Sequence, residues 1–190
     1  MKPKQLSLFT TVILSLHFLS CSPDGGNLSP LDNGGFNAFP VTNFIAISPE
    51  FPMDGTVFVG TDVAGVFRST DGGNTWVPAD AGLPVDSSGA FPGVISLAIS
   101  PAFTTDGALF MGTDAAGVFR SVNGGNTWVP ADAGLPVDSS GAFPGVILAI
   151  SPAFATDGAL FMGTDVAGVF RSVNGGNTWV PVDVGPFFSQ

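Results

Sequence analysis

The stretch Arg68-Ser69-Thr70-Asp71-Gly72-Gly73-Asn74-Thr75-Trp76 decides the fold of this 190-residue chain, because it occurs three times. It returns as Arg120-Ser121-Val122-Asn123-Gly124-Gly125-Asn126-Thr127-Trp128 and as Arg171-Ser172-Val173-Asn174-Gly175-Gly176-Asn177-Thr178-Trp179. The closing tryptophans stand 52 and then 51 residues apart. This period is longer than the roughly 33 to 47 residues of short helical repeats. The chain is therefore a tandem array of three similar units.

Each unit is expected to form four short strands. In the first unit, apolar and β-branched runs between glycine and proline turns predict strands at 44–47, 56–60, 64–68 and 75–78. The other two units repeat these runs, and no long amphipathic helical pattern follows the N-terminus. Four strands per unit make one blade of a β-propeller. We therefore predict an all-β fold, a propeller-like array of three four-stranded blades at about 39–80, 91–132 and 143–183.

The pattern Ser-x-Asp-x-Gly-x-Thr-Trp, as in Ser69 to Trp76, resembles the Asp-box, or BNR repeat. This repeat occurs in sialidases, sortilin-type receptors, xyloglucan-hydrolysing endoglucanases and a photosystem assembly factor, and the resemblance covers residues 39–181. It implies a β-propeller but no single activity, because the family includes enzymes, receptors and assembly factors. The resemblance assigns a structural role to these box residues: Ser69, Asp71, Gly73, Thr75 and Trp76; Ser121, Asn123, Gly125, Thr127 and Trp128; Ser172, Asn174, Gly176, Thr178 and Trp179.

The chemistry of the box favours a turn-stabilising role. Paired glycines allow a tight turn with positive φ, and the Asp71 carboxylate can accept backbone N–H bonds, while the indole covers the turn. The second and third boxes carry Asn123 and Asn174 in place of the aspartate. Since these amides are neutral acceptors, this position is not expected to act as a metal ligand or an acid.

Three blades are fewer than the roughly four to eight of closed propellers. The chain could complete a larger ring, such as a six-bladed dimer, or form an open stack, or be a shortened relic of a longer gene. A further irregularity lies in the third unit, where Val146 to Ile150 is one residue shorter than Val94 to Ile99. Such a deletion reverses the faces of part of a strand unless a bulge or the adjoining loop absorbs it.

The N-terminus is typical of an exported protein. Residues 1–20 have a basic start and an apolar run from Leu8 to Leu19, which predicts a signal peptide. Phe18-Leu19-Ser20-Cys21 resembles a bacterial lipobox, so we expect Cys21 to be lipidated and residues 21–36 to form a flexible tether. By the same resemblance, Ser22 favours the outer membrane or cell surface. The alternative is an ordinary cleaved signal with an incidental thiol.

The net charge of −10 becomes −12 when a signal containing two lysines is removed. Such an acidic surface is expected to repel nucleic acid and acidic polysaccharides. The expected partners are therefore a lipid bilayer through the N-terminal anchor, a second copy of the chain, and a protein or neutral glycan ligand.

No complete catalytic constellation is present in the sequence. The chain contains no tyrosine, which is the sialidase nucleophile, and its one histidine, His17, lies in the predicted signal. Because they recur at the same position in every unit, three arginines are expected to be structural residues at strand ends: Arg68, Arg120 and Arg171. For the same reason three aspartates, each followed by glycine, are expected to cap turns: Asp54, Asp106 and Asp157. Glu50 is an unshared acid and weak evidence for catalysis.

The Gly-Thr-Asp turns are the remaining candidate site. They could bring Asp62, Asp114 and Asp165 to one surface, where carboxylates could bind a ligand or Ca²⁺, although solvated turns are the simpler interpretation. No other cofactor is expected. The sequence thus predicts a non-catalytic binding or scaffold module that is lipid-anchored. The alternatives are a fragment or subunit of a glycoside-hydrolase-like propeller of the xyloglucanase or sialidase type, and a non-functional remnant.

Overall fold

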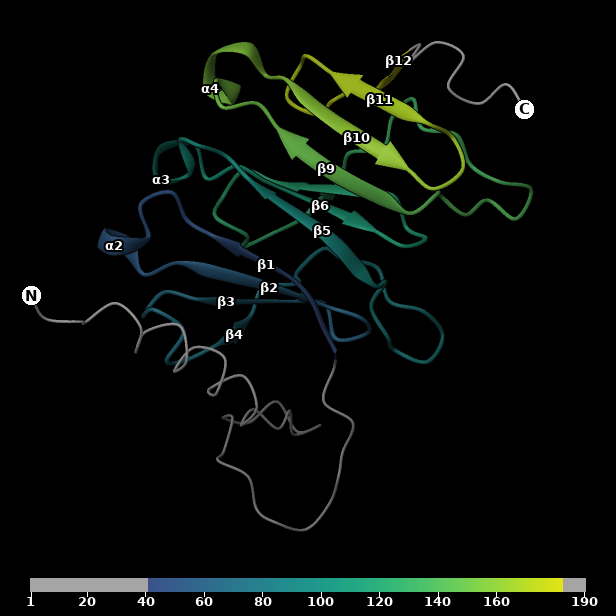
Figure 1. The fold of residues 1–190 in the computed structure, drawn as a ribbon. Helices are drawn as coiled ribbons and strands as arrows, with labels where there is room; N and C mark the ends of the chain where they lie inside the picture. Colours follow the sequence, from purple (N-terminus) through teal and green to yellow (C-terminus); the bar gives the residue numbers. More distant parts are fainter. Residues whose placement is uncertain (1–40, 183–190) are drawn as a thin grey trace, which may run out of the picture.

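The computed structural model describes residues 41–182 and confirms the all-β architecture. Three separate four-stranded antiparallel sheets lie side by side as three blades (Figure 1). The predicted signal, Cys21 and the tether lie outside the described residues, as do residues 183–190.

Within each blade the strands pair in chain order, each with the next. Blade 1 consists of β1 (Thr42–Ile47), β2 (Val57–Thr61), β3 (Val66–Ser69) and β4 (Val77–Pro78). Blade 2 consists of β5 (Val94–Ile99), β6 (Leu109–Thr113), β7 (Val118–Ser121) and β8 (Val129–Pro130). Blade 3 consists of β9 (Val146–Ile150), β10 (Leu160–Thr164), β11 (Val169–Ser172) and β12 (Val180–Val182).

One helical turn joins the first two strands of every blade, and the sequence did not predict it. These turns are α2 (Phe51–Asp54), α3 (Phe103–Asp106) and α4 (Phe154–Asp157). Each ends at a glycine with positive φ, as at Gly55, where φ is 59°. A four-residue turn is too short to show helical periodicity, so only the Asp-Gly pair that ends it was visible as a turn signal.

The connections of each blade divide between two ends of its sheet. The box end holds the one-turn helices and the three Asp-boxes, and each box turn donates a backbone N–H to the glycine after the helix, as Gly72 does to the carbonyl of Gly55 at 3.0 Å. The loop end holds the Gly-Thr-Asp turns, together with the connectors that join one blade to the next at 79–93 and 131–145.

Two of the three hydrophobic clusters among the described residues lie between neighbouring blades, and the third, around Val57, Val59 and Trp76, lies within blade 1. Figure 1 shows the first strands β1, β5 and β9 following one another across the array. Phe58 of blade 1 and Phe110 of blade 2 are both fully buried, each against the following blade. Each blade therefore depends on its neighbour to cover one face.

The one-residue deletion in the third unit is absorbed by the loss of a bulge. In blades 1 and 2 the pairing of the first strand shifts between Thr42 and Phe44 and between Val94 and Ser96. In blade 3 the pairing runs without a shift from Val146 to Ile150. The deletion removed the extra residue of the bulge, so the side chains of β9 keep their faces.

Candidate functional site

The first Asp-box shows how the repeated residues hold their turn. The Asp71 carboxylate accepts the backbone N–H groups of Asn74 and Thr75 at 3.0 and 2.9 Å, and the Thr75 hydroxyl at 2.6 Å. Ser69 donates its hydroxyl to Asp71 at 2.8 Å and accepts the N–H of Gly73 at 2.9 Å. These bonds lower the pKa of Asp71 from 3.8 to about 2, the largest cause being the Thr75 hydroxyl.

The second and third boxes make the same turn with asparagine. The Asn123 amide oxygen accepts the N–H of Thr127 at 3.0 Å, and its amide nitrogen donates to the Thr127 hydroxyl at 2.8 Å. Asn174 bonds Thr178 in the same way. The charge of Asp71 is therefore not needed to form the turn.

Replacing Asp71 by asparagine is expected to change the free energy of unfolding at neutral pH by less than about 1 kcal/mol. The lowered pKa of Asp71 means that its carboxylate stabilises the fold above pH 3.8, and that this contribution disappears as the pH falls towards 2. D71N should therefore lose less stability than the wild type over that interval. Denaturant unfolding at a series of pH values measures the difference, and parallel curves would contradict it.

The box tryptophans join one blade to the next, a role that the sequence analysis did not predict. Trp128 of blade 2 donates its indole N–H to the carbonyl of Ala79 at 2.7 Å, and its backbone N–H to the carbonyl of Ala81 at 2.8 Å. Trp179 repeats the indole bond to Ala131 at 2.7 Å. Trp76 has no preceding blade within residues 41–182, and its indole bonds the carbonyl of Gly73 in its own turn.

The box arginines also reach across the junctions between blades. Arg68 donates to the carbonyl of Gly124 at 2.8 Å and to the side-chain oxygen of Asn126 at 3.0 Å. Arg120 makes the same two bonds to the third box, and Arg171 is exposed on blade 3. Each arginine lies next to the last residue of its strand, where the repetition had placed it. The signal that could have shown their role at the junctions is the recurrence of one arginine and one pair of box glycines in every unit, because each arginine can then bond the box glycine of the next unit.

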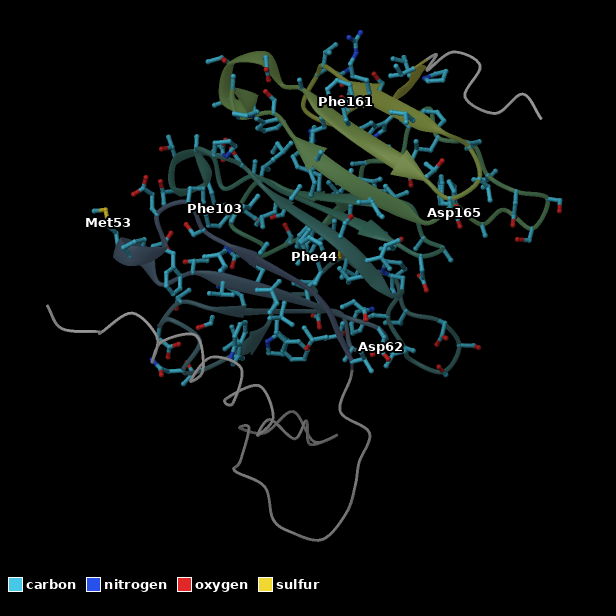
Figure 2. The ribbon with its side chains drawn as sticks, in the orientation of Figure 1. Phe44, Met53, Asp62, Phe103, Phe161 and Asp165 are labelled. Carbon is cyan, nitrogen blue, oxygen red and sulfur yellow. The ribbon has the colours of Figure 1, made fainter. Side chains whose placement is uncertain are left out.

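Two repeat-equivalent cavities open at the loop end of the array. One, of about 460 Å³, lies between blades 1 and 2, and the other, of about 250 Å³, lies between blades 2 and 3. The first is lined by Asp62, Asp86 and Asp114 together with the apolar residues of the connector, including Phe91. Figure 2 shows Asp62 and Asp165 at this same end of the sheets, with Met53 and Phe103 at the opposite end. A carboxylate-rimmed, partly apolar cavity fits a ligand that donates hydrogen bonds.

The aspartates of the Gly-Thr-Asp turns do not meet as one cluster. Asp114 accepts the backbone N–H of Gly93 at 3.1 Å, and Asp165 accepts that of Gly145 at 3.1 Å, so each fastens its turn to a connector. No group of three His, Cys, Asp or Glu able to hold a metal ion is present in the part of the chain that the structure describes. A Ca²⁺ site at these turns stays a prediction.

Other aspartates also hold local turns. Asp54 accepts the hydroxyl of Ser48 at 2.6 Å and the N–H of Thr56 at 2.8 Å. The connector residue Asp86 accepts two backbone N–H groups and the hydroxyl of Ser88, which lowers the pKa of Asp86. Asp106, Asp157 and Asp138 repeat these arrangements. Burial raises the pKa of Asp80, which follows β4.

None of the helices among residues 41–182 is long and apolar enough to cross a membrane.

Comparison with known proteins shows the fold alone. No family model and no curated protein sequence matches the chain. Among solved structures, it is similar to the extracellular domain of a one-component system protein of B. thetaiotaomicron, with 19% identity and a TM-score of 0.51. That likeness covers 82% of this chain and 18% of the other.

Two glycoside hydrolase structures of the GH74 type are also similar. The Niastella koreensis enzyme shares 20% identity at a TM-score of 0.41, covering 76% of this chain and 30% of that one. The Xanthomonas campestris xyloglucanase shares 15% at a TM-score of 0.41, covering 77% and 31%. The chain thus spans less than a third of the length of each of these three proteins.

Proposed function

We propose that this chain is a non-catalytic binding or scaffold module of the Asp-box type, exported and held at the membrane by a lipid on Cys21. The observation that carries the proposal is the structural role of its aspartates. Most aspartates that recur from blade to blade accept hydrogen bonds that hold turns, as Asp54 does at a helical turn and Asp114 does at a connector. Asp62 differs, because one of its carboxylate oxygens is buried without a hydrogen-bond partner among the described residues. Hydrogen bonds lower the pKa of four other aspartates that hold turns, which suits structural acceptors better than general acids: Asp71, Asp86, Asp138 and Asp157.

The ligand surface of this module would be the loop end. Its two cavities combine carboxylates with proline, valine and phenylalanine side chains, a mixture typical of ligand sites. A neutral glycan or a protein loop offers hydroxyl and amide donors to such carboxylates. With a net charge of −10 on the chain, anionic ligands are disfavoured.

The second candidate is a glycoside-hydrolase-like subunit, and one observation favours it. Asp62, Asp86 and Asp114 line the same cavity, and glycoside hydrolysis requires two carboxylates flanking a sugar. The two candidates separate when the chain is incubated with a panel of neutral polysaccharides, including xyloglucan. Binding without release of reducing sugar supports the module, whereas hydrolysis that D62N or D114N abolishes would establish the enzyme. D86N changes the third carboxylate of the same cavity. Comparing its hydrolysis with that of D62N and D114N shows which two of the three carboxylates the enzyme would use.

The lipid anchor is tested by Cys21→Ser in the full chain, expressed in a double-membrane bacterial host. The wild type is expected to incorporate labelled palmitate and to fractionate with membranes, because Cys21 would become the acylated N-terminal residue. C21S should lose the label completely. Ser22→Ala, which keeps the thiol, should remain labelled, and an unlabelled wild-type chain would leave an ordinary signal peptide as the explanation.

A further inference from the structure

The two outer faces of the array carry the two complementary halves of its internal junctions. At the junction of blades 1 and 2, Phe58 packs beneath Gly125 of the second box, where an added Cβ would lie 2.6 Å from the phenylalanine ring. Gly60 admits Val94 in the same junction, with only 2.3 Å between an added Cβ and a valine methyl. The junction of blades 2 and 3 repeats the first contact, with Phe110 beneath Gly176. At the position of the second contact, Gly112 faces the backbone oxygen of Val146 rather than its side chain.

Blade 3 presents the first half of this junction with nothing seated on it among residues 41–182. Phe161, the counterpart of the fully buried Phe58 and Phe110, is 44% exposed. Gly163, the counterpart of Gly60 and Gly112, has no atom within 4 Å of an added Cβ. Arg171, the counterpart of the two arginines that bond the next box, is exposed.

Blade 1 presents the second half. Its box has the same turn as the others, with the side-chain nitrogen of Asn74 bonded to Asp71, as the equivalent nitrogen of Asn126 is bonded to Asn123. The Asn74 oxygen is thus oriented to accept a guanidinium, as the Asn126 oxygen does. Ile45 at the edge of this face is 44% exposed, whereas its counterpart Leu97 at the internal junction is 5% exposed. Val57 and Val59, on the central strand of the same face, are buried in a cluster with Trp76.

Charge distinguishes the outer faces from the internal ones. Arg68 and Asn123 line one cavity of about 460 Å³ at the internal junction. The arginine of one blade therefore lies close to the Asp or Asn position of the next box. Both internal boxes have a neutral asparagine there, and the first box has Asp71. A junction between blade 3 and blade 1 would therefore place Arg171 opposite a carboxylate.

We propose that two copies of this chain associate head to tail, blade 3 of each against blade 1 of the other, and close a six-bladed ring. A head-to-tail contact forms a closed ring when its rotation closes and an open filament when it does not. Two copies of the three blades in residues 41–182 give six blades, within the range of about four to eight for closed propellers, whereas three blades are too few and nine are too many. In this ring Phe161 packs beneath the first box of the second copy, Gly163 receives Thr42, and Arg171 bonds the Gly72 carbonyl and Asn74.

The test is the mass of the full chain purified in mild detergent, measured by native mass spectrometry over a wide range of protein concentrations. The monomer mass comes from the same sample under denaturing conditions. The wild type is expected to be a dimer. Phe161→Glu, which places a charge on the open face of blade 3, and Gly163→Ala, which fills the space for Thr42, should both give monomers. No part of residues 41–182 covers either site, so both variants should fold. Val166→Glu, at a position 82% exposed on a loop, should remain dimeric.

Mixing two variants tests the direction of association. Ile45→Glu disables only the blade 1 face, so it should be monomeric alone. Mixed with Phe161→Glu in equal amounts, it should recover a dimer, because the intact face of each variant meets the intact face of the other. Asp71→Asn should keep the dimer but weaken its dissociation constant by about two- to fivefold, as expected for a partly exposed ion pair.

Four results would overturn the proposal. A wild type that stays monomeric at every concentration would mean that something other than a second copy covers these faces. A dimer that survives both Phe161→Glu and Gly163→Ala would place the contact elsewhere. A dimer lost in Phe161→Glu but kept in Ile45→Glu would mean that two blade 3 faces meet each other, and masses that rise beyond the dimer with concentration would mean an open filament.

Discussion

Trp128→Ala is expected to lower the free energy of unfolding by about 3 to 5 kcal/mol, the range measured when a large buried aromatic side chain is truncated. The indole is 2% exposed and fills the junction between blades 1 and 2. Its removal leaves a cavity and deprives the Ala79 carbonyl of its 2.7 Å donor. Because most domains are stable by only about 5 to 15 kcal/mol, this one change should bring the array close to unfolding. Urea unfolding followed by far-ultraviolet circular dichroism measures the loss.

Trp128→Phe separates the two parts of this effect. It keeps an aromatic ring in the junction but removes the indole N–H, so the Ala79 carbonyl stays buried without its donor. The expected loss is about 1 to 3 kcal/mol, the cost of an unsatisfied buried polar group. Equal losses in the two variants would mean that the hydrogen bond dominates. A loss below about 1 kcal/mol in Trp128→Ala would contradict the role of the indole in joining the blades.

Gly82→Ala should have the second largest effect. Gly82 follows blade 1 with φ at 93°, and a Cβ added there would lie 2.3 Å from the backbone oxygen of Trp128. The backbone conformation alone costs a non-glycine residue about 1 to 2 kcal/mol, and overpacking adds about 1 to 3 kcal/mol. We expect a total loss of about 2 to 5 kcal/mol in denaturant unfolding. The backbone atom cannot move aside without opening the junction.

Gly89→Ala is the matched control, because it lies in the same connector with φ at 84° and no atom lies within 4 Å of an added Cβ. It should lose only the conformational part, about 1 to 2 kcal/mol. The difference between the two variants therefore isolates the contact with the following blade. Similar losses would show that the backbone conformation, and not this contact, limits the substitution.

The fold class could be predicted from the sequence because the same pattern of strands and turns occurs in all three units. Strand runs such as Thr56 to Gly60 were located within one or two residues of β2 (Val57–Thr61), since glycine and proline turns bound them closely. The helical turns were missed because one turn has no period to detect. The consequence of the deletion in the third unit could be stated only as alternatives, because the pairing of Ile147 with Gly163 depends on a neighbouring strand.

The candidate site was predicted less completely, for a physical reason. The box residues were expected to stabilise their own turn, and Asp71 does accept the bonds of that turn. The indole of Trp128 and the guanidinium of Arg68 instead act on a neighbouring blade, 49 and 56 residues away along the chain. A motif shows which groups are close in sequence, but it does not show which groups a tertiary contact brings together.

The Phe–Gly contact at each junction has a consequence for how such a chain can evolve. Since every unit carries both the phenylalanine that packs beneath the next box and the box glycine that accommodates the previous unit, a duplicated unit fits its neighbours as soon as it is made. Gene segments of about 50 codons can thus be gained or lost without any new surface having to arise by mutation. The near-identity of Gly107–Trp128 and Gly158–Trp179 is what a recent event of this kind would leave. The length of the array is therefore free to change over generations while the chemistry of each contact is inherited intact.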